Sequence, residues 1–321
     1  TPSATHADRK SAPPNQAATA FFAKLSRCVG PLMSQDSVTE LTTTVLRKSK
    51  GRKLEDGDRL LVHYQGELLN GEQFDASFDF SRFEPEEGRT PFEFVLGAGQ
   101  VIQGWDQGLN GQKLGEVVEL KIPSELAYGE QAIGDTIPAN SPLIFTVEVL
   151  AVLPAGEAVP IFLDFKDIGI NTKKLGLTNE LLATVQFTKT GLDLNDELNG
   201  RDEADLLIGL KGKDTLHGGG GADVLIGGKG KDRFLYTAVE DSLVNEEGRD
   251  HILDFGKKDK INLKALADEL QFIKKGKFTG TAGEVRFAKE TLSIDIDGDE
   301  SAEFAVALPG VEKLKGSNLL L

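Results

Sequence analysis

The chain of 321 residues contains one cysteine, Cys28, and one tryptophan, Trp105. A single cysteine cannot form a disulfide within the chain, so stability must come from packing or bound metal. No apolar run approaches the roughly 18 residues that a membrane span needs. Because the sequence begins at Thr1 and not at Met, we interpret it as a fragment or processed product. Whether an N-terminal signal was cleaved from it cannot therefore be judged.

Basic charge is also scarce, since 36 Lys and Arg residues face 51 Asp and Glu, which gives a net charge of −15. Such a surface argues against binding to nucleic acid or to anionic membranes. The four histidines do not form the H-E-x-x-H motif of zinc proteases, and no glycine run has the spacing of a nucleotide-binding loop. Zinc hydrolysis, nucleotide chemistry and redox chemistry are therefore not indicated.

Glycine is abundant, and much of it lies in five consecutive nonapeptides from Gly191 to Leu235. The repeats starting at Gly218 and Gly227 fit G-G-x-G-x-D-x-U-x at every fixed position, where U is a large apolar residue. The repeat starting at Gly209 departs from it only at Leu210. The sixth position always holds aspartate: Asp196, Asp205, Asp214, Asp223 and Asp232. The eighth holds Leu198, Leu207, Leu216, Leu225 and Phe234.

This register predicts a solenoid, in which a short strand ending each repeat faces a core only when turns stack. Aligned carboxylates about 4 Å apart would repel by roughly 4 kcal/mol, and a hard divalent cation with oxygen ligands removes that penalty. The nonapeptide resembles the repeats-in-toxin (RTX) family, which implies a parallel β-roll with two repeats per turn and Ca²⁺ between turns. The implied metal residues are Asp196, Asp205, Gly212, Asp214, Gly219, Gly221, Asp223, Gly228, Gly230 and Asp232. Arg201 and Glu203 replace glycines in the repeat from Gly200.

Residues 42–153 show period-two alternation in several runs, for example at Val118, Leu120 and Ile122, which predicts a half-buried antiparallel sheet. Asn70-Gly71 is a strong hairpin signal. One short helix is predicted near 102–109 and would lie against the concave face of that sheet.

Three stretches in this region resemble the FKBP-type peptidyl-prolyl isomerases: VHYQGELLNGEQFDAS, PFEFVLGAGQVIQGWDQGL and ELAYGEQAIGDTIPANSPLIFTVEVL. The resemblance implies an antiparallel half-barrel around a short helix. It also implies a proline pocket made of Tyr64, Phe74, Asp75, Phe92, Val101, Ile102, Trp105, Tyr128, Ile137 and Phe145, with Trp105 as its floor. In that family the main-chain N–H at the Ile102 position and the hydroxyl at the Tyr128 position hold substrate carbonyls, while Asp75 contacts the twisted amide.

The segment Phe78–Arg89 is longer than the connection usual in the family. Two arginines, Arg82 and Arg89, are therefore alternative partners for Asp75.

The remaining segments are assigned by composition. Residues 1–41 are predicted as a disordered leader with a short helix near 21–28, residues 154–190 as a linker, 191–235 as the roll and 236–321 as a β cap. The cap resembles the end of serralysin-type secreted proteins, and Leu319-Leu320-Leu321 is similar to the ends of type I secretion substrates. Alternating carboxylates at Asp295, Asp297 and Asp299 are either a further Ca²⁺ site or a solvated turn.

Together these observations predict a mainly β protein: an α+β half-barrel with a short central helix, followed by a parallel β-roll solenoid with a β cap. The expected function is a secreted, extracellular isomerase acting on X-Pro bonds, with Ca²⁺ as a structural ion and none for catalysis. Expected partners are proline-containing polypeptides and the type I secretion machinery. The alternative is a non-catalytic chaperone or adhesin that binds proline segments through the same pocket.

Overall fold

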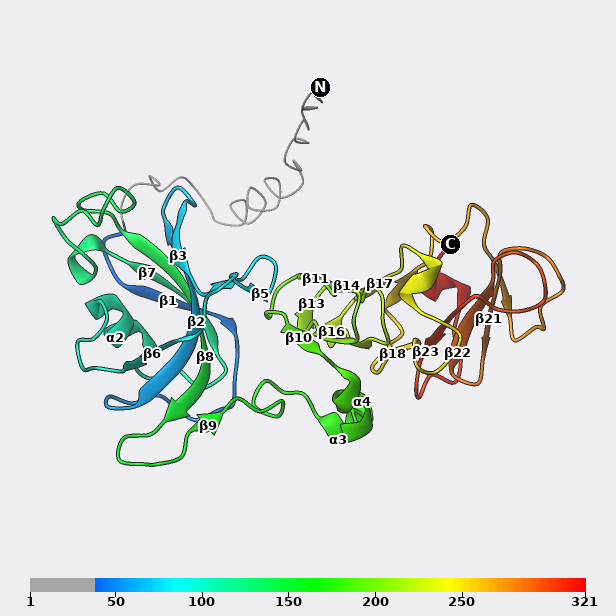
Figure 1. The fold of residues 1–321 in the computed structure, drawn as a ribbon, viewed down its shortest axis with the longest axis horizontal. Helices are drawn as coiled ribbons and strands as arrows, with labels where there is room; N and C mark the ends of the chain where they lie inside the picture. Colours follow the sequence, from blue (N-terminus) through cyan, green and yellow to red (C-terminus); the bar gives the residue numbers. More distant parts are fainter. Residues whose placement is uncertain (1–37) are drawn as a thin grey trace, which may run out of the picture. The chain divides into compact units, whose positions relative to one another are not determined.

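The computed structural model describes residues 38–321 (Figure 1). The predictions of a leader and of a helix near 21–28 concern residues outside this range, apart from 38–41. Within it, no helix is both long and apolar enough to cross a bilayer. Strands dominate, and the predicted mainly β fold is confirmed.

An antiparallel sheet with the strand order β1-β7-β8-β2-β3 forms the first half, and β6 and β9 pair with β2 and β8. Its strands are β1 (Thr42–Arg47), β2 (Arg59–Leu68), β3 (Gln73–Ala76), β6 (Phe92–Val95), β7 (Val117–Ile122), β8 (Leu143–Leu153) and β9 (Ile161–Phe162). A short hairpin, β4 (Phe78–Asp79) with β5 (Glu84–Pro85), and the 3-10 turn Ser124–Leu126 complete it. Alternating side chains of β8 are buried, as the period-two pattern predicts for a sheet with one buried face.

The single helix of this half, α2 (Gln103–Leu109), packs onto β7 through two glycines one helical turn apart. A Cβ on Gly108 would lie 2.8 Å from Leu120 Cδ2, and one on Gly104 would overlap Ile122. Glycine at both positions therefore lets the helix approach the sheet closely. This approach places Trp105, which lies between them, inside the core.

Two parallel sheets form the roll. One contains β10 (Phe187–Thr190), β12 (Asp205–Ile208), β15 (Val224–Ile226) and β18 (Asp250–Ile252), and the other contains β11 (Glu197–Asn199), β14 (Thr215–His217), β17 (Arg233–Leu235) and β19 (Lys260–Asn262). Short bridges β13 (Lys211–Gly212) and β16 (Lys229–Gly230) pair at the turns. Leu198 pairs with Leu216 and Leu207 with Leu225, so partners are two nonapeptides apart. The predicted β-roll is confirmed.

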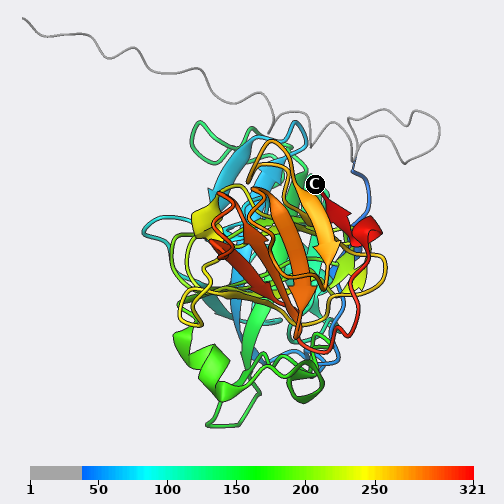
Figure 2. The same ribbon diagram turned by 90° about the vertical axis from the view of Figure 1, so that its right-hand side faces the viewer.

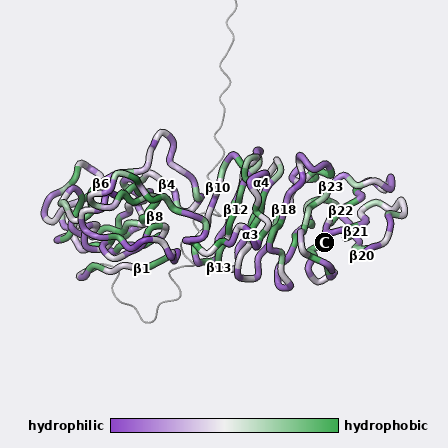
Figure 3. Tube along the Cα trace, turned by 90° about the horizontal axis from the view of Figure 1, so that it is seen from below, coloured by the Kyte–Doolittle hydropathy of each residue, from purple (hydrophilic) through white to green (hydrophobic). Residues whose placement is uncertain are grey.

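The eighth residues of all five repeats fill the space between these sheets. Each of them, from Leu198 to Phe234, has 0% of its surface exposed. Figure 3 shows the apolar strands such as β12 and β18 in green and the polar turns between them in purple. A turn of this size buries only a few apolar residues, so stacking is needed for stability.

The sheet that contains β12 and β15 is apolar on its outer face as well. Leu206, Ile208, Val224 and Ile226 pack there with residues of the two short helices α3 (Thr172–Leu175) and α4 (Asn179–Thr184). The predicted linker over 154–190 thus holds ordered elements: β9 extends the first sheet, the helices cover the roll, and β10 is the roll's first strand.

The C-terminal cap adds four strands to one roll sheet and a final strand to the other. β20 (Gln271–Lys274), β21 (Glu284–Ala288), β22 (Thr291–Asp295) and β23 (Phe304–Ala307) lie side by side, with β23 parallel to β18 (Figure 2). Two 3-10 turns, Val239–Asp241 and Gly316–Asn318, lie in the connections. β24 (Leu319–Leu320) pairs with β19, so two of the three terminal leucines extend the second sheet.

Candidate functional site

Aromatic rings from three strands, β2, β6 and β8, surround Trp105 on α2. The ring centroid of Trp105 lies 5.6 Å from that of Tyr64 and 5.2 Å from that of Phe145, and both contacts are edge to face. Phe92 adds a third such contact at 6.3 Å. Edge-to-face packing is the favourable arrangement of aromatic quadrupoles, so these rings form one stable apolar surface.

The predicted pocket residues come together around this surface but differ in exposure. Trp105, Ile137 and Phe145 are buried in one core cluster, against which the half-buried Tyr64, Phe74, Val101 and Ile102 pack. Two aromatic side chains stay open to solvent: Phe92 is 40% exposed and Tyr128 36%. The arrangement is a buried aromatic floor with an exposed aromatic rim, as a site for an apolar segment of a peptide requires.

The polar group of the pocket is Asp75 on β3. The hydroxyl of Tyr64 donates to Asp75 Oδ2 at 2.7 Å, and the Arg89 guanidinium forms an ion pair with the other oxygen. Arg89 Nε also donates to the carbonyl of Ala76 at 3.0 Å. Arg82 pairs with Asp79 instead. The structure therefore selects Arg89 from the two alternative partners of Asp75.

Burial of the Tyr64 phenol raises its pKa to about 12, and the hydrogen bond to Asp75 contributes to the rise. Burial also raises the pKa of Tyr128. Both phenols therefore stay protonated at neutral pH and can act as hydrogen-bond donors. Beside Tyr64 and Phe92 opens a cavity of about 250 Å³ whose wall includes Gly88, Arg89 and Thr90.

A ladder of aspartates runs along each edge of the roll. The main-chain N–H of Asp196 donates to Oδ1 of Asp214 at 2.9 Å, and that of Asp214 donates to Asp232 Oδ1 at 3.1 Å. On the other edge the N–H of Asp205 donates to Asp223 Oδ1 at 2.8 Å. Aspartates two repeats apart are thus stacked neighbours, and in each pair one oxygen of the later carboxylate accepts a hydrogen bond from the turn before it.

The second oxygen of several ladder residues lacks a partner. Within residues 38–321, Oδ2 of Asp214, Asp223, Asp232 and Asp250 is buried and accepts no hydrogen bond. Burial, opposed by main-chain donors and reinforced by nearby carboxylates, raises the pKa of Asp214 to about 8 and that of Asp223 to about 7. A buried oxygen without a partner costs free energy. Ca²⁺, which takes carboxylate and carbonyl oxygens, fits this donor set.

Glycines of the ladder turns are required by the stacking itself. Gly219 and Gly228 have φ values of 93° and 89°, in the left-handed region. A Cβ on Gly219 would overlap the carbonyl oxygen of Arg201 in the turn below, and one on Gly228 that of Leu210. The glycine positions predicted for the metal loops, Gly212, Gly219, Gly221, Gly228 and Gly230, therefore bring carbonyl groups of successive turns close together.

Comparison with known proteins assigns both halves. The family description "FKBP-type peptidyl-prolyl cis-trans isomerase" matches residues 50–150, and "Peptidase M10 serralysin C terminal" matches residues 213–321. FK506-binding protein 2 of Dictyostelium discoideum is 51% identical over 100 residues, which are 31% of this chain and 69% of that protein. The chain belongs to the FKBP family.

Two further relatives show how far the similarity extends. Peptidyl-prolyl cis-trans isomerase FKBP15-2 of Arabidopsis thaliana is 48% identical over 140 residues, 42% of this chain and 80% of the relative. The FK506-binding protein of Neisseria meningitidis serogroup A is 43% identical over 107 residues, 33% of this chain and 91% of the relative. This FKBP is a peptidyl-prolyl isomerase with an RTX-type C-terminal domain attached.

The first two repeats of the RTX domain differ from the rest. Arg201 donates from its main chain to Asp205 Oδ2 at 2.7 Å, and its guanidinium pairs with Oδ1 at 3.2 Å. Leu192 likewise donates its N–H to Asp196 Oδ2 at 2.7 Å. Oδ2 of Asp196 and of Asp205 therefore accepts a main-chain N–H, whereas Oδ2 in each of the three later repeats accepts no hydrogen bond. Leu210 keeps the left-handed conformation of the motif, with φ 70°, although it is not glycine.

Three aspartates of the ladders do not belong to the nonapeptides and were not predicted. The N–H of Asp223 donates to Asp250 Oδ1 at 2.9 Å, and that of Asp232 donates to Asp259 Oδ1 at 3.1 Å. Asp254 accepts from the N–H groups of Gly227 and Gly228. Asp250 and Asp259 lie 27 positions after Asp223 and Asp232, whereas the earlier ladder partners are 18 apart, so a search for a fixed period misses them.

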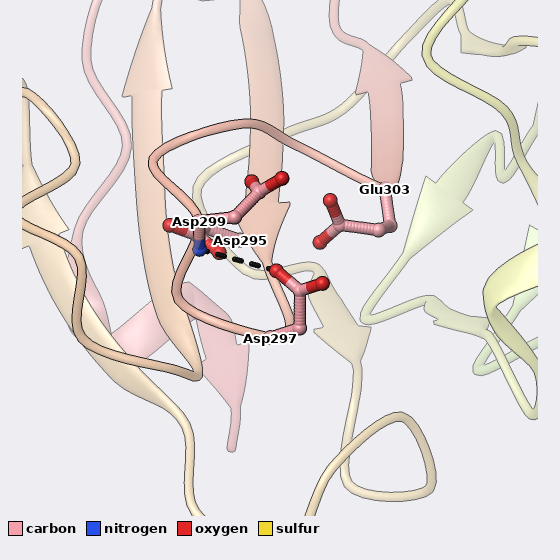
Figure 4. Close-up of side chains that lie close together, drawn as sticks. All are labelled: Asp295, Asp297, Asp299 and Glu303. Atoms are coloured by element: carbon pink, nitrogen blue, oxygen red, sulfur yellow. Dashed lines mark hydrogen bonds between the residues drawn. The ribbon is translucent and has the colours of Figure 1, made fainter.

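A separate acidic group lies in the loop between β22 and β23 of the cap (Figure 4). Carboxylate oxygens of Asp295, Asp297, Asp299 and Glu303 lie within 4.8 Å of one another. Asp295 already accepts from the N–H groups of Gly298 and Glu300, at 2.7 and 3.0 Å. The loop is compatible with a cation, and a further Ca²⁺ site here stays a prediction.

Proposed function

We propose that this FKBP is a secreted isomerase whose aromatic pocket favours the twisted X-Pro amide and whose RTX roll folds on binding Ca²⁺. The observation that carries the catalytic part is the aromatic surface around Trp105 with Asp75 at its edge. The observation that carries the calcium part is the set of buried carboxylate oxygens without partners in the ladders.

Rotation about an amide faces a barrier of about 18–20 kcal/mol because resonance favours the planar form. A site that binds the twisted form more tightly than the planar one lowers that barrier and needs no nucleophile. Trp105 and Phe145 provide the apolar floor for a proline ring, and Phe92 and Tyr128 provide the rim. Tyr128 stays protonated and can donate to a substrate carbonyl. Asp75, fixed by Tyr64 and Arg89, is the polar group beside the twisted amide.

The ladder residues would hold Ca²⁺ between stacked turns, with Asp214, Asp223, Asp232 and Asp250 offering free oxygens. Bound Ca²⁺ would supply positive charge among carboxylates that otherwise raise one another's pKa. Modules of this kind in extracellular proteins bind at about 10⁻⁴–10⁻³ M. The roll would then be unfolded at the low calcium concentration inside a cell and folded outside it.

Export is supported by the serralysin-type C-terminal domain, and the proposed carrier is a type I secretion system. The test compares the full chain with a chain that ends at Ser317, expressed in a host with such a system. The full chain is expected in the medium and the shortened chain in the cells. Equal amounts of both in the medium would reject a C-terminal signal.

The central experiment measures cis/trans exchange of a short X-Pro peptide, together with circular dichroism, in millimolar calcium and in chelator. Faster exchange in calcium and a gain of β signal on adding calcium are expected. If folded protein binds proline segments without accelerating exchange, the protein is instead a chaperone or adhesin that uses the same pocket. A spectrum unaffected by calcium would reject calcium-dependent folding.

A further inference from the structure

The tip of the β4–β5 hairpin, within residues 78–89, belongs to a buried cluster made mostly of roll and cap residues, which also contains Val117 of β7. Phe80 and Phe83 are 9% and 5% exposed, and both belong to the buried cluster that contains Leu192 and Leu198 of the first roll turn. Leu46 of β1 is packed against the same cluster. The hairpin, which is longer than the family's usual connection, therefore provides apolar cover for the roll's first turn.

An ion pair between a buried lysine and a partly exposed glutamate fixes this contact. Lys189 of β10 is 3% exposed, and its Nζ donates to Glu84 Oε1 at 2.7 Å and to the carbonyl of Arg82 at 3.4 Å. The main-chain N–H of Asp193 donates to the carbonyl of Leu46 at 2.9 Å. A buried ammonium group is costly unless it is paired, so these partners specify one position of the hairpin on the roll.

The backbone conformation of the hairpin tip also depends on its contact with the roll. Phe83 has φ 55°, a conformation that bulky residues rarely adopt. Such strain persists only where the surroundings determine the conformation. Here the Phe83 ring lies in the buried cluster that includes Leu192 and Leu198 of the first roll turn. Without a folded first turn, the hairpin tip loses what holds it in this conformation.

The other end of the same segment belongs to the proline pocket. Arg89 pairs with Asp75 and donates to the carbonyl of Ala76. Gly88, Arg89 and Thr90 line the cavity beside Tyr64 and Phe92. One short segment, residues 78–89, therefore joins the first turn of the roll to the polar edge of the pocket.

We propose that the 78–89 segment is the N-terminal cap of the roll and links calcium binding there to peptide binding in the isomerase pocket. A solenoid needs a cap at both ends, and the C-terminal strands cover only one. Calcium in the later turns folds the roll, and the first turn stacks on them through the bond from the N–H of Asp196 to Asp214. The first turn fixes Phe80, Phe83 and Glu84, and the fixed hairpin holds Arg89 on Asp75. The inference rests on the proposed calcium binding and on the pocket as the peptide site.

Linkage makes this proposal quantitative, because two coupled binding sites change each other's affinity by the same factor. The probe is a short Leu-Pro peptide followed by Trp105 fluorescence on the full chain, in calcium and in chelator. We expect peptide affinity to rise about fivefold or more in calcium. The half-saturating calcium concentration, followed by circular dichroism, should fall when peptide is present, and by a smaller factor, because the coupling free energy is shared among the several ions that the roll binds. Hydrogen exchange of residues 78–89 should slow in calcium.

The test variant is Phe80→Ala/Phe83→Ala, and the matched control is Phe162→Ala, whose ring is 63% exposed on β9. The test variant should bind peptide equally in calcium and in chelator, with the affinity that the wild type has in chelator. The control should show the same calcium-dependent rise in peptide affinity as the wild type. If the double variant fails to fold, Glu84→Gln weakens only the bond to Lys189. On adding calcium, the peptide affinity of this variant should rise, but by a smaller factor than that of the wild type.

Equal peptide affinity of the wild type in both conditions, while circular dichroism reports folding of the roll, would overturn the linkage and leave calcium binding intact. A full gain in both hairpin variants would overturn it as well. A spectrum that calcium does not change would instead overturn the proposed calcium binding, so the two failures are distinguishable.

Discussion

The main-chain N–H of Asp205 donates to Oδ1 of Asp223 at 2.8 Å, while Oδ2 of Asp223 has no partner among the described residues. One carboxylate thus performs two tasks. One oxygen fixes the stacking of two turns, and the other is available to a cation. The two tasks respond differently to substitution, which makes the ladder open to test.

Replacing Asp223 by asparagine should have opposite effects with and without calcium. The amide keeps an oxygen for the N–H of Asp205 but removes a buried charge, so the metal-free roll should become more stable. Calcium-dependent folding should need about tenfold more calcium or higher, because a charged ligand is lost. Circular dichroism during calcium titration measures both. Asp202→Asn, at an exposed position nearby, is the control and should change neither.

The metal-free roll should be more stable in mild acid than at neutral pH. In its folded state the pKa of Asp214 is about 8 and that of Asp223 about 7, against about 4 in an unfolded chain. The folded state therefore binds more protons, and the free energy of unfolding of the metal-free roll falls as pH rises from about 4 to about 8.

In chelator, circular dichroism should therefore report more β structure at about pH 5 than at about pH 8. In millimolar calcium the β signal should persist at about pH 8, because the bound ion stabilises the ionised carboxylates. Equal β signals in chelator at the two pH values would contradict the raised pKa values of Asp214 and Asp223.

Arg201 should reduce the number of ions that the roll binds. Its guanidinium and main-chain N–H occupy both oxygens of Asp205, where a cation would otherwise lie. The double substitution Arg201→Gly/Glu203→Gly restores the glycines of the motif and should add one calcium ion, measured by calorimetry. Lys213→Gly, which adds glycine at an exposed position of the next repeat, should leave the number unchanged. An unchanged number in the double variant would mean that Asp205 binds no ion even when free.

Phe92 and Phe94 separate catalysis from packing. Their rings stack with centroids 5.7 Å apart, but Phe92 is 40% exposed and Phe94 only 2%. Phe94→Ala should lower the free energy of unfolding by about 3–5 kcal/mol, as removal of a buried phenylalanine does. Phe92→Ala should cost much less stability and yet lower kcat/KM for X-Pro exchange about tenfold or more, which is 1.4 kcal/mol of transition-state stabilisation. Thermal unfolding and peptide exchange, measured on both variants, give the comparison.

Much of the architecture could be predicted because local chemistry determines it. The nine-residue register requires glycine wherever a Cβ would strike the next turn, and it requires an apolar residue at position eight, where every side chain is fully buried. The helix with Trp105 could be predicted for a similar reason, since Gly104 and Gly108 are spaced for close contact with a strand.

What could not be predicted depends on contacts between distant segments. Asp250 and Asp259 join the ladders across a longer connection that contains the turn Val239–Asp241, so the period changes from 18 to 27. The choice of Arg89 over Arg82 depends on the path of the long hairpin. The contact between the two helices and the roll was missed, although it left a signal in the sequence. Positions seven and nine are both apolar only in the repeats from Gly200 and Gly218, whose strands lie beneath α3 and α4.

The side-chain hydrogen bonds of the ladder all point the same way along the chain. Each donor N–H belongs to the earlier turn and each acceptor carboxylate to the later one, up to Asp250 and Asp259 in front of the cap. A ladder N–H therefore finds its carboxylate only when the turn after it is in place, although main-chain bonds such as that from Thr215 to the carbonyl of Asp196 run the other way. We expect the C-terminal strands to act as a template from which order spreads toward the N-terminus. A chain interrupted near its end loses the seed of the whole array, whereas one interrupted near Gly191 loses only the last turn to be added.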